Sequence, residues 1–187
     1  MHRLQSRTPL GAAAARSDTI GTLTIAEITD VALVSVSARN DQEPALRAAL
    51  ATAVGLDLPE VGQSATADDL SAFWTGPSQW MCAAPYEGGE VLCRQIKHHV
   101  GASASVVDQT DAWCRFDVSG AQVFDLFERL TKAPVRSMAP GAACRTGVEH
   151  LGVYLWCQSA THWAVIGPRS SAGSLHHALM AAARSIC

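Results

Sequence analysis

Histidine is the residue type in this sequence that most readily supports acid–base or metal chemistry, and the chain contains seven. Two adjacent pairs, His98 with His99 and His176 with His177, fall in segments that we expect to be helical. Neighbouring positions on a helix point about 100° apart, so neither pair has the i, i+4 spacing with which two histidines chelate one ion. We therefore expect these four side chains to lie at the surface or to face a partner.

Two other histidines, His150 and His162, stand beside expected strands, and neither has a carboxylate partner close in the sequence. A carboxylate that is distant in the sequence but close in the folded chain stays open as a partner for either histidine. Asp108, Asp111 and Asp117 form a loose acidic cluster around an expected turn. Asp108 and Asp111 are expected to be turn residues that bind their own backbone. The sequence holds no G-x-S-x-G nucleophile motif, no P-loop and no G-x-G-x-x-G dinucleotide motif. We therefore expect this chain to contribute no catalytic, cofactor-binding or metal-ligating residue.

The six cysteines are widely and irregularly spaced, and none forms the C-x-x-C pair of a zinc site. Most stand beside apolar residues, where a reduced cysteine behaves as a small hydrophobic side chain. Cys114 and Cys144 are each followed by arginine, a cation that lowers the pKa of a nearby thiol. Neighbours on a strand face opposite sides of the sheet, which argues against activation of these two thiols by arginine. We interpret the six cysteines as buried, reduced thiols.

The composition excludes several classes of protein. The chain has 187 residues, of which 48% are hydrophobic and 17% are charged, and its formal net charge is -3. The 14 Lys and Arg residues are too few for a basic nucleic-acid surface, and the apolar fraction is too high for a disordered chain. No apolar run approaches the ~20 residues of a membrane helix, and no secretory signal is recognisable. We expect a cytoplasmic protein with one domain, or with two small halves that share a core.

Hydrophobic periodicity predicts a mixed α and β chain after an N-terminal extension of residues 1–20. The extension is rich in alanine and has no amphipathic period, so we expect it to contact a partner or to be disordered. Apolar alternation predicts strands at 23–27, 34–36, 70–75, 79–84, 103–107, 113–118, 153–158 and 162–167. Helical spacing predicts helices at 44–54, 88–100, 123–130 and 172–186. The second helix is expected to bury Leu92, Ile96 and His99.

The order of these elements repeats along the chain. Trp74 matches Trp156 and Trp80 matches Trp163, each at an offset of about 82 residues. Each half then has the element order of a split βαβ unit. We expect an α+β fold in which two ferredoxin-like halves, about 21–101 and 102–187, form one pseudo-duplicated domain. A chance match is the alternative, because tryptophan is common in hairpins.

Five segments of the chain resemble the gamma subunits of heterotetrameric sarcosine oxidase. Residues 73–80 (FWTGPSQW) are similar to the W-x-G-P-x-x-W segment of that family, and residues 7–10 (RTPL) are similar to its R-S-P-L segment. Residues 117–120 (DVSG) resemble the strand end before its central helix. Residues 141–146 (GAACRT) resemble its G-x-x-C-R-T segment, and residues 169–175 (RSSAGSL) resemble the start of its last helix. The matches keep the family's order over nearly the whole chain.

The resemblance implies a fold related to the folate-binding T-protein of glycine cleavage. In that protein a G-G-x-x-D-D loop follows the equivalent of Thr146 and supplies the aspartate that activates folate. Residues 147–152 (GVEHLG) contain no aspartate. A folate-dependent transferase without that carboxylate lacks its evident acid–base group, so the resemblance implies a non-catalytic relative. A stand-alone, folate-binding protein of the aminomethyltransferase type is the alternative.

The resemblance also implies an assembly. The complex of that family oxidatively demethylates sarcosine to glycine, passes the one-carbon unit to tetrahydrofolate and releases hydrogen peroxide. Its FAD, FMN, NAD and tetrahydrofolate are expected on other subunits, and the expected partners are the alpha, beta and delta subunits, chiefly alpha. Candidate partner contacts are Arg7, Pro9, Leu10 and Arg145, with an intrachain ion pair as the alternative for Arg145. The low charged fraction agrees with a covered surface, because the cores of protein interfaces are depleted of charge.

Overall fold

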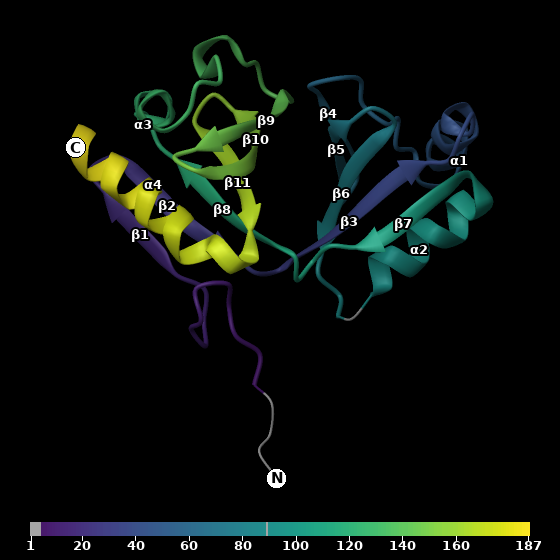
Figure 1. Cartoon of the computed structure of the whole chain (residues 1–187), viewed down its shortest axis with the longest axis horizontal. Coiled ribbons are helices and arrows are strands. Elements are labelled where there is room, and N and C mark those ends of the chain that lie inside the picture. The colour runs from purple at the N-terminus through teal and green to yellow at the C-terminus, as the bar shows by residue number, and fades with distance from the viewer. Residues whose placement is uncertain (1–4, 89) are drawn as a thin grey trace. The chain divides into compact units, whose positions relative to one another are not determined.

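The structure of this protein is a computed structural model that describes residues 5–88 and 90–187. In this part of the chain it contains four α-helices and two antiparallel sheets, so the expected α+β class is confirmed. The elements group into two compact units (Figure 1). Unit 1 holds the described residues up to Thr29 together with 112–140 and 145–187, and unit 2 holds residues 30–111 and 141–144.

Unit 1 is built on a six-stranded sheet with the order β1-β2-β8-β11-β10-β9. Its strands are β1 (Ser17–Ile20), β2 (Leu23–Ile28), β8 (Trp113–Ser119), β9 (Ala143–Val148), β10 (Leu151–Ser159) and β11 (His162–Pro168). Helices α3 (Val123–Leu130) and α4 (Ala172–Ile186) contact each other, and α4 lies across the sheet (Figure 1). The two helices and the apolar face of the sheet form the core of this unit.

Alternation along β8 decides which side chains the helices cover. Phe116 is fully buried and lies against His176 of α4, with 5.7 Å between the ring centroids. Its neighbours Arg115 and Asp117 are only partly buried and belong to the opposite face, because successive strand residues point to opposite sides. The prediction that the apolar residues of this strand share one face is therefore confirmed.

Unit 2 is built on a five-stranded sheet with the order β4-β5-β6-β3-β7. Its strands are β3 (Val31–Ala38), β4 (Ser64–Ala67), β5 (Leu70–Gly76), β6 (Gln79–Pro85) and β7 (Ala104–Asp108). Helices α1 (Glu43–Val54) and α2 (Val91–Val100) contact each other on one side of this sheet (Figure 1). Gly55 ends α1 with φ 67°, a left-handed conformation that glycine adopts without strain.

The core side chains of unit 2 become smaller toward one end of the sheet. Along the paired strands β3 and β6, Val36 lies opposite Trp80, and further along the same face Ala32 lies opposite Ala84. Trp80 is buried, and its indole N–H donates a 2.9 Å hydrogen bond to the carbonyl of Pro59. The space between sheet and helices is therefore filled at the Trp80 end and less filled at the alanine end.

The compact units do not follow the two halves of the sequence. Strand β2, which begins the expected first half, pairs with β8 in the sheet of unit 1. Strand β7, which begins the expected second half, pairs with β3 in the sheet of unit 2. The bounds of the units therefore differ from a division near residue 101, and the duplication of halves stays a prediction.

Hairpin register changes one of the matched tryptophan pairs. Trp74 lies opposite Trp80 across β5 and β6, and the residue opposite Trp163 across β10 and β11 is Cys157. If Trp80 is the equivalent of Trp163, the register equivalent of Trp74 is therefore Cys157, one residue from the matched Trp156. A shift of one residue moves a side chain to the other face of the sheet, so the distinction decides where each indole packs.

Three strands and one helix boundary differ from the sequence predictions. Strands β1, β4 and β9 were not expected, because they are short or rich in small and polar residues and lie at the edges of the sheets. Helix α2 begins at Val91 rather than at residue 88. Its buried stripe is Leu92, Ile96 and Val100, so the prediction that His99 is buried is wrong.

Candidate functional site

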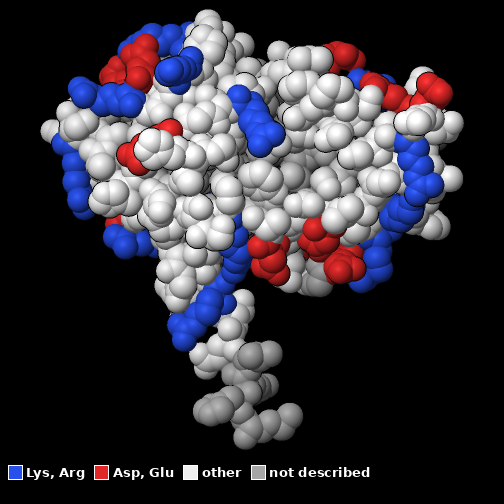
Figure 2. All heavy atoms as spheres, viewed as in Figure 1, with Lys and Arg blue, Asp and Glu red and all other residues white. Residues whose placement is uncertain are grey.

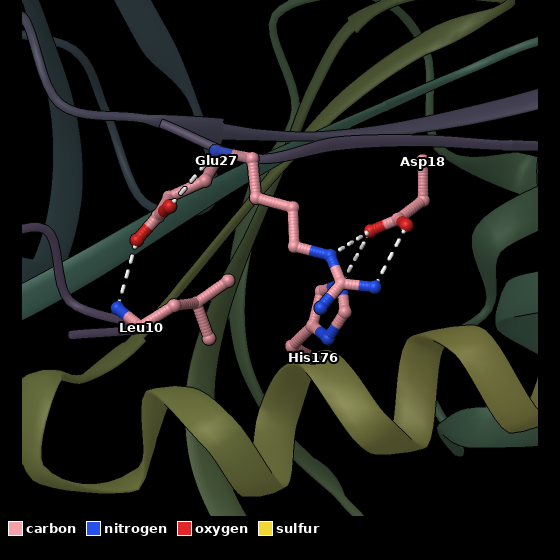
Figure 3. A network of polar contacts seen from close by, with 5 residues as sticks. Leu10, Asp18, Glu27 and His176 are labelled. Carbon is pink, nitrogen blue, oxygen red and sulfur yellow. Dashed lines mark hydrogen bonds and ion pairs between the residues drawn. The ribbon is translucent and has the colours of Figure 1, made fainter. Parts of the chain in front are cut away.

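The N-terminal segment is fixed to unit 1 by one buried carboxylate. Glu27 of β2 is only 4% exposed. Its two oxygens accept hydrogen bonds from the backbone N–H groups of Leu10 at 2.8 Å and Arg16 at 3.0 Å (Figure 3). The guanidinium of Arg169 also donates a 2.7 Å hydrogen bond to the carbonyl of Arg7. Hydrogen bonds to a charged group are stronger than neutral ones, so the described part of the extension is held by its own chain.

A second polar cluster lies beside this segment. Both oxygens of Asp18 on β1 accept hydrogen bonds from the Arg16 guanidinium, at 2.7 and 2.9 Å, and Nε2 of His176 lies 2.8 Å from Asp18 Oδ2 (Figure 3). The hydrogen bond from Arg16 lowers the pKa of Asp18, with a smaller contribution from His176, while burial acts in the opposite direction. The cluster thereby joins the N-terminal segment, β1 and α4.

The four predicted partner contacts do not form one group. Arg7 and Leu10 use backbone atoms to bind unit 1, and Pro9 lies between them in a turn. Arg145 stands on β9, which is the sheet edge opposite to β1. Its guanidinium carbon lies 5.9 Å from the centre of the Tyr154 ring, and the residue is exposed. A role of these residues toward a partner stays a prediction.

A third cluster, on the open face of β8, was not recognised in the sequence. Arg115 and Asp117 form a bidentate ion pair with distances of 2.6 and 2.9 Å, and both side chains are mostly buried. Nε2 of His162 on the adjacent β11 lies 2.9 Å from Asp117 Oδ2. Arg115 also lies over the ring of Trp156, 5.6 Å from its centre. The alternating pattern of β8 indicates part of this cluster, because it places Arg115 and Asp117 on the same face of the strand.

This cluster orients an imidazole without completing a nucleophilic site. A carboxylate that holds one ring nitrogen of a histidine is the arrangement by which enzymes position a general base. The side chain of His162 is 42% exposed. Among the described residues, however, no hydroxyl or thiol is hydrogen-bonded to this ring. In the part of the chain that the structure describes, the cluster therefore has no nucleophile in place for this imidazole to activate.

The other histidines and aspartates follow simpler patterns. Asp108 accepts a 2.8 Å hydrogen bond from the backbone N–H of Thr110, as expected for a turn residue. His98 and His99 are exposed, which agrees with the prediction of surface positions. His176 is only 11% exposed at its side chain and is bound to Asp18, so the surface prediction is wrong for this residue.

None of the six cysteines, all of which the structure describes, is in a disulfide; three are buried, and Cys93 and Cys144 are half-buried. Burial raises the pKa of Cys82 to about 12 and that of Cys114 to about 11, so the neighbouring arginine does not activate Cys114. Cys187 is exposed, and the prediction of burial is wrong there. Among the described residues no three His, Cys, Asp or Glu side chains are grouped closely enough to hold a metal ion. None of the described helices is both long and apolar enough to cross a membrane.

Unit 2 contains a cavity of about 520 Å³ at the end where its core side chains are small. Helices α1 and α2 and the sheet contribute its apolar walls, and three acidic side chains lie around it. The acidic side chains are Asp68, Asp69 and Glu87. No local pattern of residues indicates this cavity, because its walls come from segments far apart along the chain.

Comparison with known proteins finds similar solved structures but no similar sequence family. No protein-family model matches the chain, and no curated protein matches it. A chain of heterotetrameric sarcosine oxidase from Corynebacterium sp. U-96 superimposes with a TM-score of 0.77 and 20% sequence identity. The match covers 87% of this chain and 84% of that one.

A second solved structure shares the fold over part of its length. The glycine cleavage system aminomethyltransferase T from Bartonella henselae matches with a TM-score of 0.65 and 13% identity, over 82% of this chain and 44% of that chain. Identities this low establish the fold rather than the activity. Both likenesses fit the resemblance found in the sequence, and the protein has a T-protein-like α+β fold that it shares with a chain of heterotetrameric sarcosine oxidase.

Proposed function

We propose that this chain is a non-catalytic gamma subunit of a heterotetrameric sarcosine oxidase. The observation that carries the proposal is the likeness to the Corynebacterium chain, which extends over 87% of one chain and 84% of the other. The match therefore extends over most of both chains and is not confined to one of the two units. The five sequence segments that resemble this family are an independent support, because they lie in the same order.

In this proposal the complex oxidatively demethylates sarcosine to glycine, transfers the one-carbon unit to tetrahydrofolate and releases hydrogen peroxide. The FAD, FMN, NAD and tetrahydrofolate of the complex belong to the other subunits, in the cytoplasm. The role of this chain is to stabilise the assembly, chiefly against the alpha subunit. On the face shown in Figure 2, broad areas carry no charged side chain, which suits a surface covered by protein.

The proposal includes a duplicated origin for the two units. The strand order β5-β6-β3-β7 of unit 2 corresponds to β10-β11-β8-β2 of unit 1, and each unit has two helices at the corresponding points of the chain. Both hairpins also have an irregular register after the equivalent residues Trp74 and Cys157. Superposition of the two units in an experimental structure tests this origin. Trp80 should then coincide with Trp163, and any other alignment contradicts it.

The second candidate function is a stand-alone aminomethyltransferase-type protein that binds folate. The likeness to the T-protein, with a TM-score of 0.65, is what favours it. Against it stands the turn between β9 and β10, where Glu149 and His150 occupy the region in which the T-protein has its aspartates. Calorimetric titration of the isolated chain with tetrahydrofolate separates the two candidates. Measurable binding with transfer of a methylene group would favour the transferase.

Co-expression tests the subunit role directly. The tagged chain is produced together with the alpha, beta and delta subunits encoded in the same genome, and the complex is isolated through the tag. A stable four-subunit complex with sarcosine oxidase activity is expected, and recovery of the tagged chain alone as a monomer contradicts the proposal. Arg145→Ala should weaken the assembly, whereas the matched variant Arg184→Ala, at an exposed position of α4, should not.

A further inference from the structure

The cavity of unit 2 has no role in the proposed subunit function, and none of the candidate partner contacts lines it. Its volume of about 520 Å³ lies within the range of roughly 300–1,000 Å³ that is typical of small-molecule sites. The deepest side chains around it belong to the hydrophobic core of the unit. These are Leu50 of α1 and Leu92 and Ile96 of α2, none of which is more than 9% exposed.

The cavity results from small residues on the sheet. Ala32 and Ala84 lie directly opposite each other on β3 and β6, on the face that the helices cover. On the same face Val36 and Trp80 fill the corresponding space four residue pairs along the two strands. Ala67, at the end of β4, is a third small residue on the wall. The helices rest on larger side chains elsewhere, so they span this end of the sheet without filling it.

The charged groups around the cavity all have one sign. Asp68 and Asp69 occupy the turn between β4 and β5, and Glu87 follows β6; all three are exposed. No lysine or arginine is among the described residues that line the cavity, and His99 and Gln95 complete its polar rim. Carboxylates beside an apolar wall attract a cation and repel an anion.

We propose that this cavity binds a small organic cation, an aliphatic amine whose hydrocarbon part lies against the alanines and leucines and whose ammonium group faces Asp68 and Asp69. The apolar walls select for the hydrocarbon, since each methylene group that leaves water tightens binding roughly two- to fourfold. The acidic rim selects for the positive charge. A fatty acid of the same length satisfies the walls but is repelled by the rim.

This inference is independent of the proposed subunit role, because the cavity lies within unit 2. The test uses the isolated full-length chain and NMR titrations with three probes of equal length: hexylammonium, hexanol and hexanoate. Shifts of the methyl signals of Ala32 and Ala84 report occupancy of the cavity. Hexylammonium should bind roughly fivefold or more tightly than hexanoate, with hexanol between them, and added salt should reduce the difference.

Two kinds of variant test the two halves of the proposal. The double variant Asp68→Asn with Asp69→Asn should remove most of the preference for hexylammonium and leave hexanol unchanged. Asp57→Asn is the matched control, because Asp57 is an exposed aspartate of the same unit that does not line the cavity. Ala84→Leu should abolish binding of all three probes by filling the cavity.

The titrations give a definite answer even if Ala84→Leu does not fold, because the double variant changes only exposed side chains. Equal affinity for hexylammonium and hexanoate overturns the proposal. So does an unchanged preference in the double variant, or shifts that leave Ala32 and Ala84 unaffected.

Discussion

The backbone N–H of Leu10 donates a 2.8 Å hydrogen bond to the carboxylate of Glu27, across 17 residues of chain. The carboxylate is buried in unit 1, and its other oxygen holds the N–H of Arg16. The turn formed by the segment between these two residues is therefore closed by a single side chain. This relationship makes the turn between Leu10 and Arg16 depend on the Glu27 side chain, while Arg169 holds the carbonyl of Arg7 separately.

Replacement of that group should release the segment. Glu27→Gln leaves one acceptor oxygen for the N–H groups of Leu10 and Arg16 and turns an NH2 donor toward the other N–H. We therefore expect a loss of about 2 kcal/mol in the free energy of unfolding. Trypsin should then cleave after Arg16 faster than in the unmodified protein. Glu149→Gln, in an exposed turn of the same unit, is the control and should change neither measurement. Equal cleavage rates in all three proteins would contradict the role of Glu27.

The pKa of Asp18 should make stability depend on pH in the acidic range. Hydrogen bonds from Arg16 and His176 lower this pKa below its ordinary value of 3.8. A lowered pKa in the folded state stabilises the protein above the ordinary value, and the contribution disappears as the pH falls through the folded-state pKa. The difference in unfolding free energy between the unmodified protein and Asp18→Asn should therefore be constant near neutrality and shrink below about pH 4. A difference that stays constant down to pH 2 would show that the ion pair contributes nothing.

The two central tryptophans should respond differently to the same substitution. Trp80 and Trp163 are both fully buried, but Trp80 donates to the Pro59 carbonyl, whereas the N–H of Trp163 has no partner among the described residues. Trp80→Phe leaves a buried carbonyl without its donor, and Trp163→Phe removes an unpaired polar group. We expect Trp80→Phe to cost about 1 kcal/mol or more beyond the cost of Trp163→Phe in urea unfolding. The reverse order would contradict the hydrogen bond.

Gly120 should not tolerate a side chain. Its φ is +137°, and a Cβ built on it would lie 2.0 Å from the carbonyl oxygen of Thr22. Gly120→Ala forces the backbone of the β1–β2 turn to move, so we expect a loss of more than about 3 kcal/mol. Gly173→Ala, in the first turn of α4 with no atom within 4 Å, should be neutral or stabilising by up to about 1 kcal/mol. Thermal unfolding of both variants measures the contrast, and similar melting temperatures would contradict the close approach.

Thiol labelling should distinguish the cysteines by burial. Cys187 is exposed, and burial raises the pKa of Cys82 to about 12. Near pH 8, an aromatic disulfide reagent should modify Cys187 in a fast phase, while Cys82 and Cys114 react only after unfolding. Cys187→Ser should remove the fast phase. Persistence of that phase in the variant would show that another thiol is the accessible one.

The elements with strong apolar periodicity could be predicted from the sequence alone. Helix α4 has the predicted bounds, and Gly55 ends α1 as expected. Both features depend on residues that are close together in the sequence: apolar residues at helical spacing, and a glycine at the helix end. Strands β1 and β4 were missed, since their short segments have no apolar face of their own and become strands by pairing at a sheet edge.

The polar sites were harder to predict, because their members are distant in the sequence. His162 and Asp117 are 45 residues apart and become neighbours only through the pairing of β8 with β11. His176 and Asp18 are 158 residues apart and meet where α4 crosses β1 and β2. No local pattern indicates such pairs, although the alternation of β8 already placed Asp117 on the face opposite to the core.

The pairing of β2 with β8 also sets an order of events during synthesis. The ribosome produces β1 and β2 first, then the continuous stretch 30–111 that forms most of unit 2, and only then β8. Strand β2 therefore cannot pair with β8 until most of unit 2 has been synthesised. Nascent unit 2 can reach its native sheet well before unit 1 does, and the hydrogen bonds between β2 and β8 form late.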